Sequence, residues 1–74
     1  MWHTGIIEGY WWQAKVYDEG SRFGIDGGRV SKLHICRGEK WDWFAQVYGY
    51  SRGLDFDNCP NDIVRKVLEY CESL

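Results

Sequence analysis

The C-terminal segment of this 74-residue chain carries its clearest periodicity. Apolar residues recur there at the spacing of one helix face: Ile63, Val64, Val67, Leu68, Cys71 and Leu74. The charged residues of the opposite face are Arg65, Lys66, Glu69 and Glu72. Asn58, Cys59 and Pro60 have the composition of a helix start. The pattern predicts one amphipathic helix over residues 59–74, and such a helix needs an apolar surface to cover.

Upstream of this segment, four runs are rich in β-branched and aromatic residues and are typical of strands: Trp2–Glu8, Tyr10–Tyr17, Arg29–Arg37 and Trp41–Tyr50. In the second run, Trp12, Ala14 and Val16 share one face, because successive side chains of a strand alternate between its two faces. Leu33 and Ile35 share a face of the third run in the same way. We expect all of these side chains to point towards the core.

An α+β fold accounts for these elements with short connections. It places a four-stranded antiparallel β-meander in residues 2–50, a connector in 51–58 and the amphipathic helix in 59–74, all in a single domain of residues 1–74. A helix of about fourteen residues is roughly 21 Å long, which is enough to cover one face of such a sheet. The opposite face of the sheet then has no covering element.

Nine basic and eleven acidic residues give the chain a formal net charge of −2. This balance lacks the basic excess that neutralises the phosphates of duplex nucleic acid, so duplex binding is not expected. Five Trp, five Tyr and three Phe are more large rings than so small an interior encloses. Some of these rings must lie at the surface, where Trp and Tyr are favoured in interfaces with other molecules.

The three cysteines, Cys36, Cys59 and Cys71, are odd in number and form no Cys-x-x-Cys pair. They are best interpreted as reduced thiols rather than as the disulfide framework of a secreted protein. The chain also has no apolar run long enough for a membrane span or a signal core. We therefore expect a cytoplasmic protein without a membrane partner.

Candidate catalytic and metal-binding groups do not form a recognisable site. His34 and Cys36 share a strand face, but two ligands do not close a tetrahedral zinc site, so neither a metal nor another cofactor is expected. The same pair lacks a third, orienting group for nucleophilic catalysis, and Ser21 and Ser31 have no recognisable base nearby in the sequence. The sequence therefore predicts a protein that is not an enzyme.

Four glycines punctuate the loop between the second and third runs: Gly20, Gly24, Gly27 and Gly28. They define the path of the loop, because glycine is used where the backbone needs a positive φ or a close approach. Charged residues surround them: Asp18, Glu19, Arg22, Asp26, Arg29 and Lys32. The loop amides and arginines could hold an anion, or the glycines could shape a wide turn with solvated charges. The turn is favoured, since no Gly-Lys-Ser/Thr of a phosphate-binding loop is present.

Three stretches of the chain form a more specific pattern: Ala-Lys-Val-Tyr-Asp-Glu-Gly-Ser at 14–21, Phe-Gly-Ile-Asp-Gly-Gly-Arg-Val-Ser-Lys-Leu at 23–33 and Tyr-Ser-Arg-Gly-Leu-Asp at 50–55. This pattern resembles a family of small uncharacterised proteins from Gram-positive bacteria and from their phages and mobile elements. The family has Tyr-Asp-Arg-Gly-Trp-Asp in the last stretch, so Ser51 and Leu54 depart from it. The resemblance carries no activity. It implies a phage or mobile-element accessory protein in a Gram-positive cytoplasm, with a host macromolecule as its partner.

These observations predict a non-enzymatic interaction domain that binds a host protein through an open sheet face, a strand edge or the glycine loop. The candidate binding residues are Trp11, Arg22, Asp26, Arg29, Lys32 and Trp43. One alternative is a protein that sequesters a small ligand or nucleotide with the loop amides and arginines. Another is single-stranded nucleic-acid binding, in which exposed rings of the sheet stack on bases. An uncovered face or edge also allows a homodimer.

Overall fold

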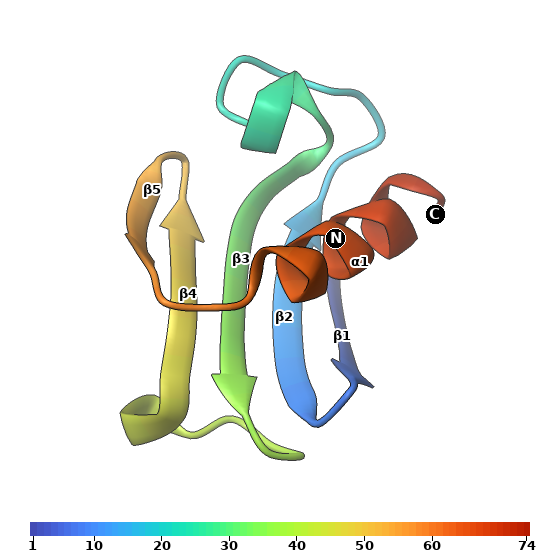
Figure 1. The fold of residues 1–74 in the computed structure, drawn as a ribbon. Helices are drawn as coiled ribbons and strands as arrows, with labels where there is room; N and C mark the ends of the chain where they lie inside the picture. The colour runs from blue at the N-terminus through green and yellow to red at the C-terminus, as the bar shows by residue number, and fades with distance from the viewer.

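A five-stranded antiparallel sheet with one helix across it forms the fold of the computed structural model, which describes residues 1–74 apart from the side chain of Phe56 (Figure 1). The elements are β1 (Trp2–Ile7), β2 (Tyr10–Val16), β3 (Val30–Arg37), β4 (Gln46–Ser51), β5 (Leu54–Asp57) and α1 (Asn61–Glu72). The strands lie in the sheet in the order of the sequence. The fold is therefore α+β, with an antiparallel meander and one C-terminal helix, as the sequence predicts.

The sheet has five strands, not the four predicted, because the segment predicted as a connector over 51–58 contains β5. Arg52 has a left-handed backbone with a φ of 59° and turns the chain back beside β4, where Leu54 pairs with Tyr50. Apolar and acidic residues alternate over Leu54–Asp57, which is the period of a strand. The segment is short and acidic and follows the turn-forming residues Arg52 and Gly53, so the sequence alone does not indicate a strand there.

The predicted fourth strand, 41–50, is shorter in the structure and begins at Gln46. The segment before it forms a 3-10 turn, η2 (Trp43–Ala45). The Asp42 carboxylate accepts a hydrogen bond of 3.0 Å from the Phe44 amide, which bends the backbone away from an extended path. The aromatic residues of this segment therefore lie in a turn at the end of the sheet.

The helix α1 has twelve residues and is shorter at both ends than the predicted range 59–74. It begins after Pro60, whose carbonyl accepts hydrogen bonds from the amides of Ile63 and Val64. Proline suits this position because its backbone has no amide proton to satisfy. No helix in the described chain is long and apolar enough to cross a membrane.

The core lies between α1 and one face of β2 and β3, and Figure 1 shows the helix crossing the sheet on that side. The side chains predicted to point inwards are confirmed as buried: Trp12, Ala14, Val16, Leu33 and Ile35. The helix contributes Ile63, Val67 and Cys71 to the same cluster. Since the single helix of the described chain packs on this face, the opposite face of the sheet is open.

The three cysteines are buried and free, so none forms a disulfide within the described chain. Burial raises the pKa of the Cys59 thiol and of the Cys71 thiol to about 11. Both groups are therefore protonated at neutral pH, and a thiol is a much weaker nucleophile than a thiolate. Cys59 and Cys71 belong to the apolar core, where they act as small hydrophobic side chains.

Candidate functional site

The open face, meaning the face of the sheet opposite α1, carries the side chains that alternate away from the core. They are Trp11, Gln13 and Lys15 on β2 and Lys32, His34 and Cys36 on β3. The strand register opposes them in the pairs Trp11 with Cys36, Gln13 with His34 and Lys15 with Lys32. The register thus places the lysines near the β2–β3 loop and Trp11 near the β3–β4 connection. Figure 1 shows that these two connections lie at opposite ends of the sheet.

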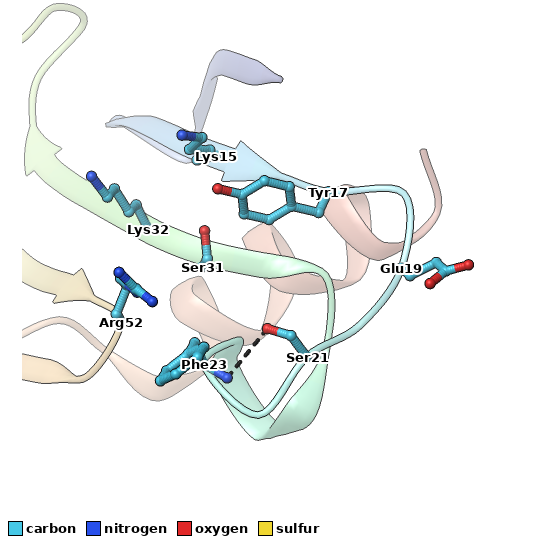
Figure 2. A pocket seen from close by; sticks show the side chains of 8 residues that line it. All are labelled: Lys15, Tyr17, Glu19, Ser21, Phe23, Ser31, Lys32 and Arg52. Atoms are coloured by element: carbon cyan, nitrogen blue, oxygen red, sulfur yellow. Dashed lines mark hydrogen bonds between the residues drawn. The ribbon is translucent and has the colours of Figure 1, made fainter.

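The cationic hollow is a concavity of about 410 Å³ at the β2–β3 loop end of the open face. Figure 2 shows the residues that line it: Lys15, Tyr17, Glu19, Ser21, Phe23, Ser31, Lys32 and Arg52. Its three cations come from β2, from β3 and from the turn between β4 and β5. Glu19 is the acidic residue of the lining, and its carboxylate points away from the three cations in Figure 2.

The cations of the hollow, Lys15, Lys32 and Arg52, have no carboxylate within 4.0 Å among the described side chains. The ion pairs that the described residues do form all involve the helix: Arg65–Glu69, Lys66–Glu8 and Lys66–Asp62. Lys15 and Lys32 also lie directly opposite each other in the sheet, where like charges repel and lower stability. The protein therefore has a positive region at this end of the open face, although the net charge of the whole chain is −2.

Two hydroxyl groups accompany these cations. The neighbouring Lys15 side chain lowers the pKa of the Tyr17 hydroxyl from its usual value of 10.0, burial opposes this shift, and Ser31 and Lys32 add smaller effects in the direction of Lys15. Ser31 is only 5% exposed, and its hydroxyl points from β3 towards Tyr17 (Figure 2). The direction of this shift follows from the cationic side chains that lie beside the Tyr17 hydroxyl.

The aromatic cluster, made of Trp11, His34, Trp41 and Trp43, occupies the other end of the open face. The ring centroids of Trp11 and Trp41 are 5.7 Å apart and those of Trp41 and Trp43 are 5.8 Å apart, both in edge-to-face arrangements. Such contacts are favourable and restrict the orientation of the rings. Trp43 is nevertheless 70% exposed, and the neighbouring Phe44 is 98% exposed. The cluster therefore presents an ordered apolar patch to solvent.

His34 supports the cluster from the sheet. Its ring centroid lies 5.9 Å from that of Trp41, and its Nδ1 accepts a hydrogen bond of 3.0 Å from the side-chain amide of Gln46. Burial lowers the pKa of His34 below its usual value of 6.5, while Asp55 opposes this shift and Lys32 adds to it. The imidazole is therefore neutral at neutral pH, as an acceptor at Nδ1 requires.

The lowered pKa of His34 makes stability depend on pH. The unfolded chain takes up the proton first as pH falls, so the contribution of His34 is complete above about pH 6.5 and is lost as pH falls through the lower pKa of the folded state. We expect the melting temperature to fall less between about pH 7.5 and about pH 5.5 in a His34→Gln variant than in the parent protein. Equal decreases in the two proteins would contradict this role.

The glycine loop is folded on itself. The amides of Gly24, Gly27 and Gly28 donate hydrogen bonds of 2.9 to 3.0 Å to carbonyls of the loop, and the centre forms a 3-10 turn, η1 (Ile25–Gly27). A Cβ atom on Gly24 would lie 1.9 Å from the Gly28 carbonyl oxygen, so this close approach requires glycine. The amides that would hold an anion are used within the loop, which agrees with the interpretation of the loop as a shaped turn.

The six residues predicted as a binding site do not lie together. Trp11 and Trp43 belong to the aromatic cluster, and Lys32 lines the cationic hollow. Arg22 lies beside the hollow, with its guanidinium carbon 4.9 Å from the ring centroid of the next residue. Asp26 lies in η1 and lines a different hollow, which also contains residues of α1.

Arg29, the sixth predicted residue, joins the β2–β3 loop to the end of α1. Its Nε donates a hydrogen bond of 2.7 Å to the Tyr17 carbonyl, and its Nη1 donates one of 3.0 Å to the Glu72 carbonyl. The Glu72 carboxylate also accepts a hydrogen bond of 2.7 Å from the Arg29 amide. These contacts give Arg29 a structural role and leave it outside the cationic hollow.

A family model described as a domain of unknown function (DUF7678) matches residues 1–72. The chain belongs to the DUF7678 family. No curated protein and no solved structure matches the chain. The DUF7678 match spans both the cationic hollow and the aromatic cluster, so both features lie inside the domain that defines the family.

Lys15, Tyr17 and Arg52 line the hollow of this DUF7678 domain, although the sequence did not single them out as site residues. They are distant from Lys32 in the sequence, and only the strand register and the β4–β5 turn bring the four together. The available signal was alternation, because Lys15 and Lys32 both fall on strand faces opposite the predicted core residues. Alternation along a strand identifies the face of the sheet on which a side chain lies, but it does not identify the residue of the next strand that lies beside it.

The open face of the DUF7678 domain offers electrostatic and apolar contacts. The cationic hollow can hold an anion, and the aromatic cluster can pack against an apolar or flat group. Among the described residues, no group of three His, Cys, Asp or Glu side chains is placed to hold a metal ion. The arrangement is therefore suited to binding, with one charged region and one apolar region on a single face.

Proposed function

We propose that this DUF7678 domain is a non-enzymatic interaction domain that binds a host protein through the open face of its sheet. The aromatic cluster carries this proposal, because it exposes Trp43 on a face that the helix leaves open. Tryptophan supplies much of the binding energy of protein interfaces when it becomes buried. The edge-to-face contacts already hold the rings in place, so binding orders fewer side chains.

The surface that fits this face has an apolar centre and acidic groups to one side. Lys15, Lys32 and Arg52 have no carboxylate partners within the described chain, so carboxylates of a partner can approach them without breaking an existing ion pair. Complementary charges of this kind speed association and fix the orientation of the two proteins. The aromatic cluster then supplies the anchor, and the cationic hollow supplies the orientation.

The proposed setting is the cytoplasm of a Gram-positive bacterium, where the domain serves as an accessory protein of a phage or mobile element. The resemblance of segments 14–21, 23–33 and 50–55 to small proteins of such elements supports this setting. The free cysteines support it as well, because reduced thiols persist in reducing compartments. A host regulatory or defence protein is the proposed partner.

Single-stranded nucleic acid is a second candidate partner, favoured by the presence of exposed rings and unpaired cations on one face. Bases stack on aromatic side chains while phosphates meet the cations, and every base offers a flat surface for stacking. The ion-paired acidic residues of the helix lie away from this face and do not screen it. Steep weakening of binding with salt would be the sign of this mode.

A photo-crosslinking amino acid placed at Phe44 tests the proposed surface inside cells of a Gram-positive host. Phe44 is 98% exposed, so its replacement leaves the core intact. Glu69 on α1 provides the matched control position, with a side chain that is 71% exposed on the opposite side of the molecule. We expect protein adducts from position 44 but not from position 69, and we expect Trp43→Ala to abolish them.

The partner identified in this way permits a quantitative test by isothermal titration calorimetry. Trp43→Ala should weaken binding by about 30-fold or more, which corresponds to a loss of about 2 kcal/mol, whereas Glu69→Ala should leave the Kd unchanged. Adducts that form equally at both positions, or that persist in Trp43→Ala, would refute the proposed surface. Salt-sensitive binding of a single-stranded oligonucleotide that Trp43→Ala abolishes would assign the face to nucleic acid.

A further inference from the structure

We propose that the cationic hollow is a binding site for a doubly charged phosphate group, carried by a small molecule as an ester or free as inorganic phosphate. Lys15, Lys32 and Arg52 hold the phosphate oxygens in this site. The site lies at the opposite end of the open face from the aromatic cluster. This proposal concerns a small ligand and does not depend on the protein partner, whose carboxylates would approach the same three cations.

The placement of the cations is the first argument for this site. Lys15 and Lys32 are opposed across β2 and β3, and Lys32 is in turn paired with Ser51 on β4, the residue before Arg52. Three positive groups, two on neighbouring strands and one in the β4–β5 turn, therefore lie at one end of the sheet. Without a ligand the opposed lysines repel each other, whereas a dianion between them is attracted to both.

The backbone of Arg52 adds to this argument. Its φ of 59° lies in the left-handed region, which is uncommon for residues other than glycine, asparagine and aspartate. The Arg52 amide donates a hydrogen bond of 2.9 Å to the Ser31 carbonyl, which fixes this turn against β3. The turn thus holds a guanidinium group beside the two lysines, and guanidinium groups match the oxygens of a phosphate with two donors at once.

The remaining lining suits an oxyanion with an organic group attached. The hydroxyls of Tyr17 and Ser31 supply neutral polar groups beside the cations. The rings of Tyr17 and Phe23 are 46% and 39% exposed and line the hollow, with Lys15 Nζ 5.4 Å from the Tyr17 ring centroid and the Arg52 guanidinium carbon 4.5 Å from the Phe23 ring centroid. The volume of about 410 Å³ is much larger than a phosphate ion and lies in the range of small-molecule sites. Phosphate fits the three positive charges better than a singly charged carboxylate does.

Isothermal titration calorimetry with inorganic phosphate, AMP and adenosine tests the site on the intact protein. We expect binding of AMP or inorganic phosphate and no binding of adenosine, which has the same organic group without the phosphate. Tighter binding of AMP than of phosphate would identify an ester as the ligand, and the reverse would identify the free ion. Absence of binding by both, or equal binding of AMP and adenosine, would overturn the proposal.

Two substitutions localise the binding. Lys32→Gln removes one cation, and Arg52→Asn removes another while keeping a residue that tolerates the left-handed backbone. Each should weaken the binding of the phosphate probe by about 10-fold, the effect of losing one charge-assisted hydrogen bond. Arg65→Gln on α1 removes the same charge far from the hollow and should leave the affinity unchanged.

Melting curves without phosphate show whether these variants fold. We expect Lys32→Gln to melt at the same temperature as the parent or a few degrees higher, because the repulsion from Lys15 is removed. Parent-like affinity in both Lys32→Gln and Arg52→Asn would overturn the proposal. Trp43→Ala should bind the phosphate probe normally, so loss of partner binding and loss of phosphate binding are separate outcomes.

Discussion

Replacement of Leu33 by alanine is expected to lower the free energy of unfolding by about 2–5 kcal/mol, the range found for such truncations in a packed core. Leu33 is fully buried at 0% exposure, in the cluster between β3 and α1. Truncation leaves a cavity that the sheet and helix close only in part. Urea denaturation followed by circular dichroism measures the change.

The neighbouring residue provides the control for this experiment. Lys32 lies on the same strand, but its side chain is on the open face, so Lys32→Ala should change the free energy of unfolding by no more than about 0.5 kcal/mol, or should raise it slightly by removing the repulsion from Lys15. Comparable losses in Leu33→Ala and Lys32→Ala would show that the two faces of the sheet are assigned incorrectly.

Replacement of Gly24 by alanine is expected to lower the free energy of unfolding by about 1–3 kcal/mol, as overpacking does elsewhere. The added Cβ would lie 1.9 Å from the Gly28 carbonyl oxygen, and because the backbone fixes the position of a Cβ and the oxygen belongs to the backbone, no side-chain rotation relieves the contact. The loop must open for the methyl group to fit, which breaks its internal hydrogen bonds. Thermal or urea denaturation detects the loss.

Gly53 is the matched control for Gly24. A Cβ on Gly53 meets nothing within 4 Å, and its φ is not positive. Gly53→Ala should therefore raise the free energy of unfolding by about 0.4–1 kcal/mol, because alanine restricts the unfolded chain more than glycine does. Substitutions of the same kind should thus have opposite signs at the two positions, and a stabilised Gly24→Ala variant would disprove the folded loop.

The helix and the core face of the sheet were predictable because each follows from a short-range period. Ile63 and Val67 are spaced for one helix face, and Trp12, Ala14 and Val16 alternate along one strand. These periods depend only on the geometry of a single element, and burial of the apolar set decides which face turns inwards. Both features are confirmed by the buried cluster.

The fifth strand was not predictable in the same way, because the local signals around it conflict. Arg52 and Gly53 indicate a turn, and the acidic residues that follow are depleted in strands. Pairing with β4 supplies the hydrogen bonds that override these preferences. The η2 turn has a similar origin, since one side-chain contact from Asp42 outweighs the strand preference of the aromatic residues beside it.

The candidate sites depend on information that no local pattern carries. Lys15, Lys32 and Arg52 meet only after the register of three strands is fixed. The net charge is a sum over the whole molecule, so a value of −2 does not show whether one end of the open face is positive. Trp43 could be named as an exposed ring from composition alone, but its contact with Trp41 required the turn that precedes β4.

Because every strand pairs with its neighbour in the sequence, the hairpins of this sheet can assemble while the chain is still leaving the ribosome. The helix that shields Leu33 and Ile35 is translated after all of the strands. Until residues 61–72 emerge, the nascent sheet displays its apolar side as well as its aromatic side. We expect the growing chain to be most prone to aggregation during that interval of synthesis.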